Sequence, residues 1–170
     1  TTPSQKIEKV KYFGGELTEV RIEGRSFDDS KNLALRESSE NYKTFIHPFD
    51  DYNVIAGQGT VAKEVYEQMN DLDYIIAPVG GGGLLSGIGI FFEDNPKVKI
   101  IGVEPEDSSA MKQSILANKI IELEHVGIFA DGVAVKRVGN LTFEYTKKYV
   151  DEIITVSTDE ICFAIQQIFE

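Results

Sequence analysis

The sequence predicts an α/β protein with open, mostly parallel sheets and helices on both faces. Two features support this prediction. Short apolar runs, such as those at 74–79 and 98–103, alternate with longer segments of helical periodicity. This alternation is typical of a parallel sheet, because each crossover between neighbouring strands uses a helix. Four consecutive glycines at 80–83 join one apolar run to the next helical segment, the kind of junction where α/β proteins bind ligands.

Helical periodicity and turn residues predict the elements of the first third of the chain. Thr2 followed by Pro3 marks a capped helix start, and the pair Gly14-Gly15 marks its end. Alternating apolar residues predict strands, and His47-Pro48 interrupts the pattern. The expected order is a helix ending at Gly14, a strand at 17–22, a helix at 27–40, a strand at 44–46 and a loop at 47–53.

The same signals predict the elements of the remaining chain. Apolar runs rich in Ile and Val predict strands. Asn140 and either Ser157 or Thr158 are expected to cap two of the helices. The expected order is a helix of about ten residues after 54–60, a strand at 74–79, a helix at 84–93, a strand at 98–103, a helix at 107–118, an irregular stretch to 139, a helix at 140–149, a strand at 153–156 and a terminal helix.

The four glycines are predicted to form a phosphate-binding loop. A strand that ends in glycines before a helix leaves backbone N–H groups directed into one concavity, at the positive end of the helix dipole. Glycine suits such a loop because the anion approaches the backbone closely and some turn residues need a positive φ. The alternative interpretation is a tight turn between a strand and a helix, without a ligand.

The residues around the loop limit which anion it binds. A Walker loop ends in Gly-Lys-Ser/Thr, but Leu84 and Leu85 follow the glycines here. The Rossmann fingerprint Gly-x-Gly-x-x-Gly fails at Leu85. Glu104, about 20 residues after the loop, is the one feature that favours a dinucleotide, because an acidic residue at that distance holds a ribose.

Composition excludes several classes of protein. No apolar run approaches the roughly 18 residues of a membrane span, and no membrane partner is expected. The formal net charge of −11 argues against nucleic acid as a partner, since binding its phosphates needs a basic face. The single cysteine, Cys162, lies in an apolar helical segment and is expected to be a buried, inert thiol. With no disulfide possible within the chain, a cytoplasmic location is expected.

Four segments in order along the chain resemble the threonine dehydratase family. Each motif is ambiguous alone, but the four at family-like spacing are specific. Gly127-Ile128 before the last segment favours the biosynthetic type over the catabolic type and serine racemase. The segments are IAGQGT at 55–60, VGGGGLLSG at 79–87, GVEPE at 102–106 and FADGVAVKR at 129–137.

This resemblance implies a pyridoxal 5'-phosphate (PLP) enzyme of the tryptophan-synthase-β-like fold. In that fold a large and a small open α/β domain enclose the cofactor. Residues 1–52 would form the second half of the small domain, and residues 53–170 part of the large PLP-binding domain. The resemblance assigns the cofactor phosphate to Gly80, Gly81, Gly82, Gly83 and Leu84, and a substrate pocket to Phe49, Asp131 and Gly132.

Two motifs of the family do not occur in this sequence. The lysine segment Phe-Lys-x-Arg-Gly-Ala, which carries the Schiff base, and the Ser-Ser-Gly-Asn-His loop around the cofactor ring are both expected upstream. The hydroxyl residue that faces the pyridine nitrogen, and any domain that senses isoleucine, are expected beyond Glu170. The chain is therefore interpreted as the middle of a longer polypeptide, and this segment alone is expected to be inactive, with no catalytic residue of its own.

The resemblance implies deamination of L-threonine to 2-oxobutanoate and ammonia in isoleucine biosynthesis, by a dimer or tetramer. Three alternatives remain. The first is a serine/threonine dehydratase or a serine racemase relative, because most of the substrate pocket lies outside this sequence. The second is an NAD-binding oxidoreductase domain that uses the glycines and Glu104. The third is a binding module without catalytic activity.

Other polar residues have plainer interpretations. An Asp-Gly turn at 131–132 is a common structural device, and Phe49 fits an ordinary core contact as well as a pocket wall. His47 and His125 lack partners at metal-ligand spacing and are interpreted as a loop residue and a surface residue. Glu104 resembles the first ligand of the divalent-cation site in serine racemase, but Ala110 stands where the second carboxylate would be. No metal site is therefore predicted.

Overall fold

The computed structural model describes residues 2–24, 27–69 and 71–169. The chain forms two compact units, Thr1–Ile46 and His47–Glu170. The boundary predicted from the sequence, between residues 52 and 53, lies slightly later than this one. The assignment of the two units to a small and a large domain stays a prediction. Among the described residues, no helix is both long and apolar enough to cross a bilayer.

The first unit is helical. The predicted helix at 27–40 is confirmed, and the first helix begins at Ser4 with Pro3 in the capping position. The strands expected at 17–22 and 44–46 are wrong, because no strand occurs in the described part of this unit. A strand needs a partner for its ladder hydrogen bonds, and no described residue of the unit is buried. Its elements are α1 (Ser4–Gly14), η1 (Gly15–Leu17) and α2 (Phe27–Glu40).

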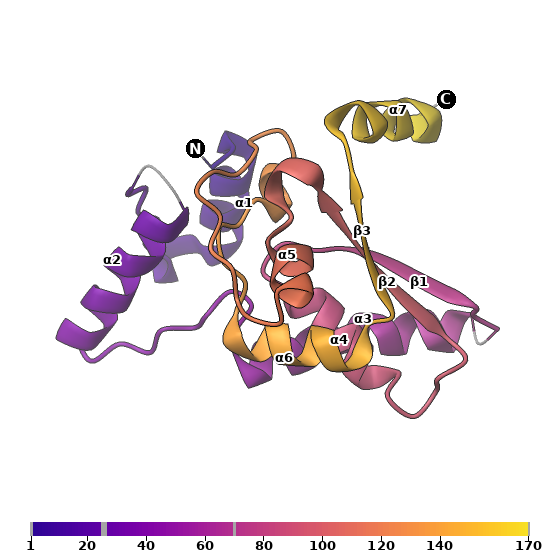
Figure 1. Ribbon diagram of the computed structural model, residues 1–170. Helices are drawn as coiled ribbons and strands as arrows, with labels where there is room; N and C mark the ends of the chain where they lie inside the picture. Colours follow the sequence, from indigo (N-terminus) through magenta and orange to yellow (C-terminus); the bar gives the residue numbers. More distant parts are fainter. Residues whose placement is uncertain (1, 25–26, 70, 170) are drawn as a thin grey trace. The chain divides into compact units, whose positions relative to one another are not determined.

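The second unit contains a parallel three-stranded sheet in the order β1-β2-β3, which confirms the α/β class (Figure 1). Ala77 of β1 pairs with Gly102 of β2, and Gly102 pairs with Ile153 of β3. The elements are α3 (Tyr52–Gln68), β1 (Tyr74–Pro78), α4 (Gly83–Phe91), β2 (Lys99–Pro105), η2 (Glu106–Ser108), α5 (Ala110–Leu116), η3 (Asp131–Val133), α6 (Asn140–Tyr149), β3 (Glu152–Val156) and α7 (Thr158–Phe169).

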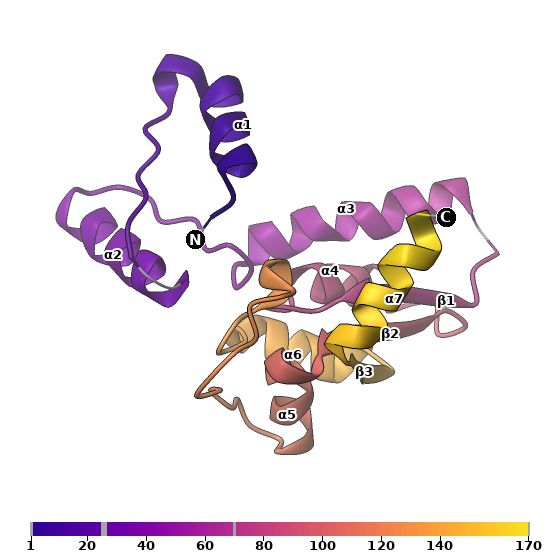
Figure 2. The ribbon, with the colours of Figure 1, turned by 90° about the horizontal axis from the view of Figure 1, so that it is seen from above.

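The helices α4 and α6 lie on one side of this sheet, and α3 packs against α4 (Figures 1 and 2). Both crossovers move in the same direction across the sheet, so the right-handed rule directs them to the same face. Tyr74 and Ile76, which point to the opposite face of β1, remain 60% and 63% exposed. The described helices α4 and α6 therefore lie on one face of the sheet, and the prediction of helices on both faces stays a prediction for the other face.

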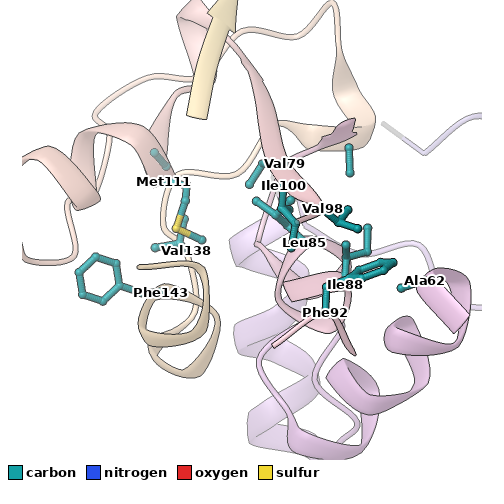
Figure 3. Packing of buried hydrophobic residues seen from close by; sticks show 12 residues of the cluster. Ala62, Val79, Leu85, Ile88, Phe92, Val98, Ile100, Met111, Val138 and Phe143 are labelled. Atoms are coloured by element: carbon teal, nitrogen blue, oxygen red, sulfur yellow. The ribbon is translucent and has the colours of Figure 1, made fainter. Parts of the chain in front are cut away.

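The core surrounds α4 and includes residues of the sheet and of α3, α5 and α6 (Figure 3). Because α4 is buried around most of its circumference, its sequence is apolar nearly throughout. Figure 3 shows Leu85 and Ile88 of this helix packed with Ile100 of β2. This cluster fixes the start of α4, and therefore the glycine loop before it, relative to the ends of the strands.

The helix α3 starts earlier than the sequence analysis expected. Residues 54–60 were expected to lead into a helix, but they lie inside α3, which begins at Tyr52. The cause is Asp51, whose side chain accepts hydrogen bonds from the amides of Asn53 and Val54 at 2.8 and 3.1 Å. Of the two glycines in this segment, Gly59 serves helix packing. A Cβ on Gly59 would lie 3.2 Å from the carbonyl oxygen of Gly87.

The prediction of a buried thiol at Cys162 is wrong. Cys162 is exposed, and so is the next residue on α7, Phe163. Phe163 is 63% exposed and Ile168 87%. The helical periodicity correctly predicts an amphipathic helix, and Ser157 caps it by accepting from the amide of Glu160. What covers the apolar face of the helix is not determined by its own sequence.

Candidate cofactor-phosphate site

The glycine loop joins the carboxyl end of β1 to the amino end of α4, as predicted. Gly82 has φ 93° and ψ 0° and precedes the first helical residue, Gly83. Ser86 donates its amide to the carbonyl of Gly82 and so closes the first turn of the helix. Among the described residues, no hydrogen bond uses the loop amides, which are those of Gly80, Gly81, Gly82, Gly83 and Leu84.

These free amides fit a phosphate group. They lie at the amino end of a helix, where the dipole attracts an anion. Gly80, Gly81 and Leu84 are partly exposed, while Gly82 and Gly83 are buried. Buried amides usually have hydrogen-bond partners, so a loop that leaves a run of them unpaired is suited to bind a ligand that accepts hydrogen bonds. Phosphate oxygens are such acceptors.

The structure revises the reason for the glycines. Positive φ is needed at only one of them, Gly82. At the other three positions a Cβ would crowd the protein itself, and at Gly81 it would overlap the ring of Phe49. It would lie 3.0 Å from the Cα of Val133 at Gly80, 2.3 Å from the ring of Phe49 at Gly81, and 3.0 Å from the Cβ of Phe49 at Gly83. Glycine is therefore needed because two other segments pack closely onto the loop, in addition to the predicted close approach of an anion.

One of these segments runs from His47 to Asp51, and we call it the strap. His47 Nδ1 accepts hydrogen bonds from the amides of Phe49 and Asp50, at 3.3 and 2.9 Å. This turn directs the ring of Phe49 onto Gly81. The prediction that His47 is a loop residue is confirmed, and its ring organises the strap. His125 is exposed, as predicted.

Asp50 fastens the strap to α6. Its carboxylate accepts hydrogen bonds from the amides of Asn140, Leu141 and Thr142, at 2.9, 2.8 and 3.3 Å. Gly139 occupies the capping position, where a Cβ would lie 2.2 Å from Asp50 Oδ1. The prediction that Asn140 caps this helix is therefore wrong. Asp50 replaces a local cap and also places a negative charge at the positive end of the helix dipole.

We expect Asp50→Ala to destabilise the protein by about 1–2 kcal/mol, the usual cost of a lost helix cap. The substitution also frees the strap that carries Phe49, so affinity for PLP is expected to fall. Asp51→Ala is the matched control, because Asp51 caps α3 within the same segment and does not hold α6. Urea unfolding and PLP titration of both variants are the measurements. Equal PLP affinity in the two variants would contradict the role of the strap.

Of the predicted substrate-pocket residues, Phe49 contacts the loop, while Asp131 and Gly132 lie next to a residue that does. Phe49 is half-buried and touches the loop directly. Asp131 and Gly132 are exposed at the start of η3, and the next residue, Val133, packs on Gly80. The structure thus brings both predicted segments to the loop, while a substrate role for Phe49, Asp131 and Gly132 stays a prediction. Sequence reasoning missed Asp50 and the loop contacts of Thr142 and Met111, because these are long-range contacts without a local motif.

Glu104 binds the start of α5 and is not arranged to hold a ribose. It is fully buried in β2, and its two carboxylate oxygens accept the amides of Met111 and Lys112 at 2.9 and 2.8 Å. Burial raises the pKa of Glu104 to about 7, although the two amides and the charge of Lys112 lower it. Both oxygens are buried and engaged with α5, which weakens the dinucleotide interpretation.

The structure places Ala110 fully buried at the start of α5, beyond Glu104. Within the described ranges, no three His, Cys, Asp or Glu side chains gather as metal ligands. The expected lack of a metal site stays a prediction that only a binding measurement can test.

The fold and the loop together define the class of protein. The chain belongs to the family of pyridoxal-phosphate dependent enzymes, whose sequence profile matches residues 1–170. It is 46% identical to the L-threonine dehydratase biosynthetic IlvA of Haemophilus influenzae, over 99% of this chain and 33% of that protein. It is 44% identical to the Escherichia coli protein of the same name, over 99% of this chain and 32% of the relative. The chain thus spans about a third of these relatives.

Solved structures agree with this assignment. The processed form of threonine deaminase isoform 2 from Solanum lycopersicum has a TM-score of 0.90 and 40% identity, covering 99% of this chain and 49% of that one. Maize serine racemase has a TM-score of 0.88 and 34% identity, covering 98% of this chain and 51% of that one. The predicted fold family and the dependence of the family on PLP are confirmed.

Proposed function

We propose that this chain is a segment of a PLP-dependent threonine ammonia-lyase, which deaminates L-threonine to 2-oxobutanoate and ammonia. Identity of 44–46% to biosynthetic threonine dehydratases across nearly the whole chain supports this proposal. The observation that carries it is the loop of unpaired amides at the amino end of α4. Such amides bind phosphate, and PLP carries a phosphate group. The name of these relatives supports a place in isoleucine biosynthesis, and we propose a cytoplasmic location.

In this proposal the chain anchors the cofactor and orients it. The amides of the glycine loop and Leu84 donate hydrogen bonds to the phosphate, and the dipole of α4 adds attraction for the dianion. Phe49, Asp131 and Gly132 border the side where the amino acid binds. Bound PLP supplies the electron sink that makes the α-proton of the amino acid acidic. The base that takes this proton is not provided by these residues, so the segment alone is inactive in this proposal.

A serine racemase or a serine-preferring dehydratase is the second candidate. The similarity to maize serine racemase supports it, since its TM-score of 0.88 is close to the 0.90 of the threonine deaminase. In the proposal the glycine loop and Leu84 bind the cofactor phosphate, and phosphate binding is the same for each of these reactions. The substrate must therefore be decided by experiment.

The test uses the complete polypeptide that carries this chain, loaded with PLP. We expect L-threonine to yield 2-oxobutanoate, measured by reduction with lactate dehydrogenase, at a higher kcat/KM than L-serine yields pyruvate. Chiral chromatography of the serine reaction should detect no D-serine. D-serine as the main product would favour the racemase, and a protein that binds no PLP would contradict the proposed function altogether.

We also propose that the complete protein is a dimer or tetramer that binds neither nucleic acid nor membranes. The net charge of −11 supports the exclusion of nucleic acid. Light scattering coupled to size-exclusion chromatography measures the assembly directly, and a monomer at all concentrations would contradict this part of the proposal.

A further inference from the structure

We infer that Thr142 is a positioning residue of the phosphate loop, which it holds in the conformation that presents the Gly82 amide to the cofactor. The inference rests on the proposed function, because it assumes that the loop binds the PLP phosphate. Thr142 lies in the first turn of α6 and is fully buried. Its hydroxyl donates a hydrogen bond to the carbonyl oxygen of Gly81 at 2.6 Å.

This hydrogen bond fixes the orientation of a whole peptide group. The carbonyl of Gly81 and the amide of Gly82 belong to the same planar trans peptide, so the two groups point in opposite directions. Because the carbonyl points to Thr142, the Gly82 N–H points away from it. Among the described residues, no group of the protein accepts that N–H.

The loop needs such a restraint because glycine flanks the peptide on both sides. Glycine populates positive and negative φ about equally, so a peptide between two glycines can rotate at little cost. Gly82 is observed at φ 93°. Thr142 and Met111 fill the space beside its Cα. A Cβ on Gly82 would lie 3.0 Å from the Cβ of Thr142 and 2.5 Å from the Cε of Met111. The buried hydroxyl selects one orientation of a peptide that the sequence leaves free.

Thr142 is itself held from two sides. Its amide donates to Asp50 Oδ1 at 3.3 Å, and its carbonyl accepts from Ser86 Oγ at 3.2 Å. Asp50 belongs to the strap and Ser86 to α4, so Thr142 links the strap, the loop and α4. Thr146 offers a contrast one turn later on α6. It is equally buried, but its hydroxyl lies 3.4 Å from Ser86 Oγ and does not contact the loop.

The experiment compares how tightly variants of the complete polypeptide bind PLP and pyridoxal, which lacks the phosphate. The dissociation constant of pyridoxal divided by that of PLP measures the preference for the phosphate, and this ratio isolates the contribution of the phosphate. Thr142→Val removes the hydroxyl at nearly constant volume and should reduce this ratio about tenfold, as expected when one hydrogen bond to a charged group is lost. Thr142→Ser retains the hydroxyl and should restore the ratio to within about twofold of wild type. The matched control Thr146→Val should leave the ratio unchanged.

The outcomes separate the inference from the proposed function. If wild-type protein binds pyridoxal as tightly as PLP, the phosphate site itself is refuted. If wild type strongly prefers PLP and Thr142→Val keeps the whole preference, the positioning role is overturned while the site stands. An equal loss in Thr146→Val would also overturn it, because the effect would then be general loosening of α6. Thermal unfolding of each apoprotein identifies variants that do not fold, and Thr142→Ala then takes the place of Thr142→Val with the same expected ratio.

Discussion

Gly87→Ala is expected to destabilise the protein by about 2–3 kcal/mol, a typical cost of forcing an extra carbon into a packed core. A Cβ on Gly87 would lie 2.5 Å from the amide nitrogen of Gly59 and 2.6 Å from the carbonyl oxygen of Ile55. These are backbone atoms of α3, which cannot rotate away as a side chain can. Relief requires α3 and α4 to separate, and that movement would open the core around Leu85 and Ile88. Urea unfolding of the variant measures the loss.

Gly57→Ala provides the matched control for this prediction. Gly57 is also a glycine inside a helix, but nothing lies within 4 Å of the position that its Cβ would take. Alanine should therefore stabilise α3 by about 0.5–1 kcal/mol, the usual difference between alanine and glycine in a helix. If both variants change stability equally, the close crossing of α3 and α4 is not what requires Gly87.

Glu104 is expected to make the stability of the protein fall as pH rises from about 4.5 to 7. Burial raises the pKa of its carboxyl group to about 7 from its ordinary value of 4.5. Within this window the folded protein keeps a proton on Glu104 that the unfolded chain has released, so rising pH favours the unfolded chain. At 1.36 kcal/mol for each pKa unit, the total loss is about 3 kcal/mol, fully present above pH 7.

The measurement is the free energy of unfolding of Glu104→Gln and wild type at several pH values between 4 and 8. Glutamine does not titrate, so the difference between the two proteins should change by about 3 kcal/mol across this range and then level off. The amide loses one of the two acceptors for α5, but that cost is the same at every pH. Glu106→Gln is the control, because Glu106 is exposed. A constant difference between Glu104→Gln and wild type would show that folding does not shift the pKa of Glu104.

Local sequence signals were sufficient where an element is stabilised by its own residues. The helix at 27–40 was predicted from periodicity, and its bounds match the structure. The bounds of the helix at 140–149 also match, although its cap is supplied by Asp50 and not by Asn140 as predicted. The strands at 74–79 and 98–103 were predicted because buried parallel strands are continuous apolar runs. The failed strand at 17–22 was predicted from alternating apolar residues, but no neighbouring strand is present to pair with it in the described part of its unit.

The position of the candidate site could be predicted from the sequence, but the contacts that hold the glycine loop in place could not. Four glycines between a strand and a helix show where amides are free, and this signal is local. Asp50 caps α6 across 90 residues of sequence, and Thr142 contacts Gly81 across 61. No motif records such contacts, because they arise only when the strap, the loop and α6 pack together. For the same reason, the sequence could not show that Phe49 and Val133 require glycine in the loop.

The central claim is that the amides of the glycine loop bind the phosphate of PLP. The most direct test is a crystal structure of the complete polypeptide with bound PLP. The account predicts phosphate oxygens at hydrogen-bond distance, about 2.7–3.1 Å, from several of the amide nitrogens of Gly80, Gly81, Gly82, Gly83 and Leu84. Ordered PLP with its phosphate held by other groups, and these amides left without it, would contradict the account.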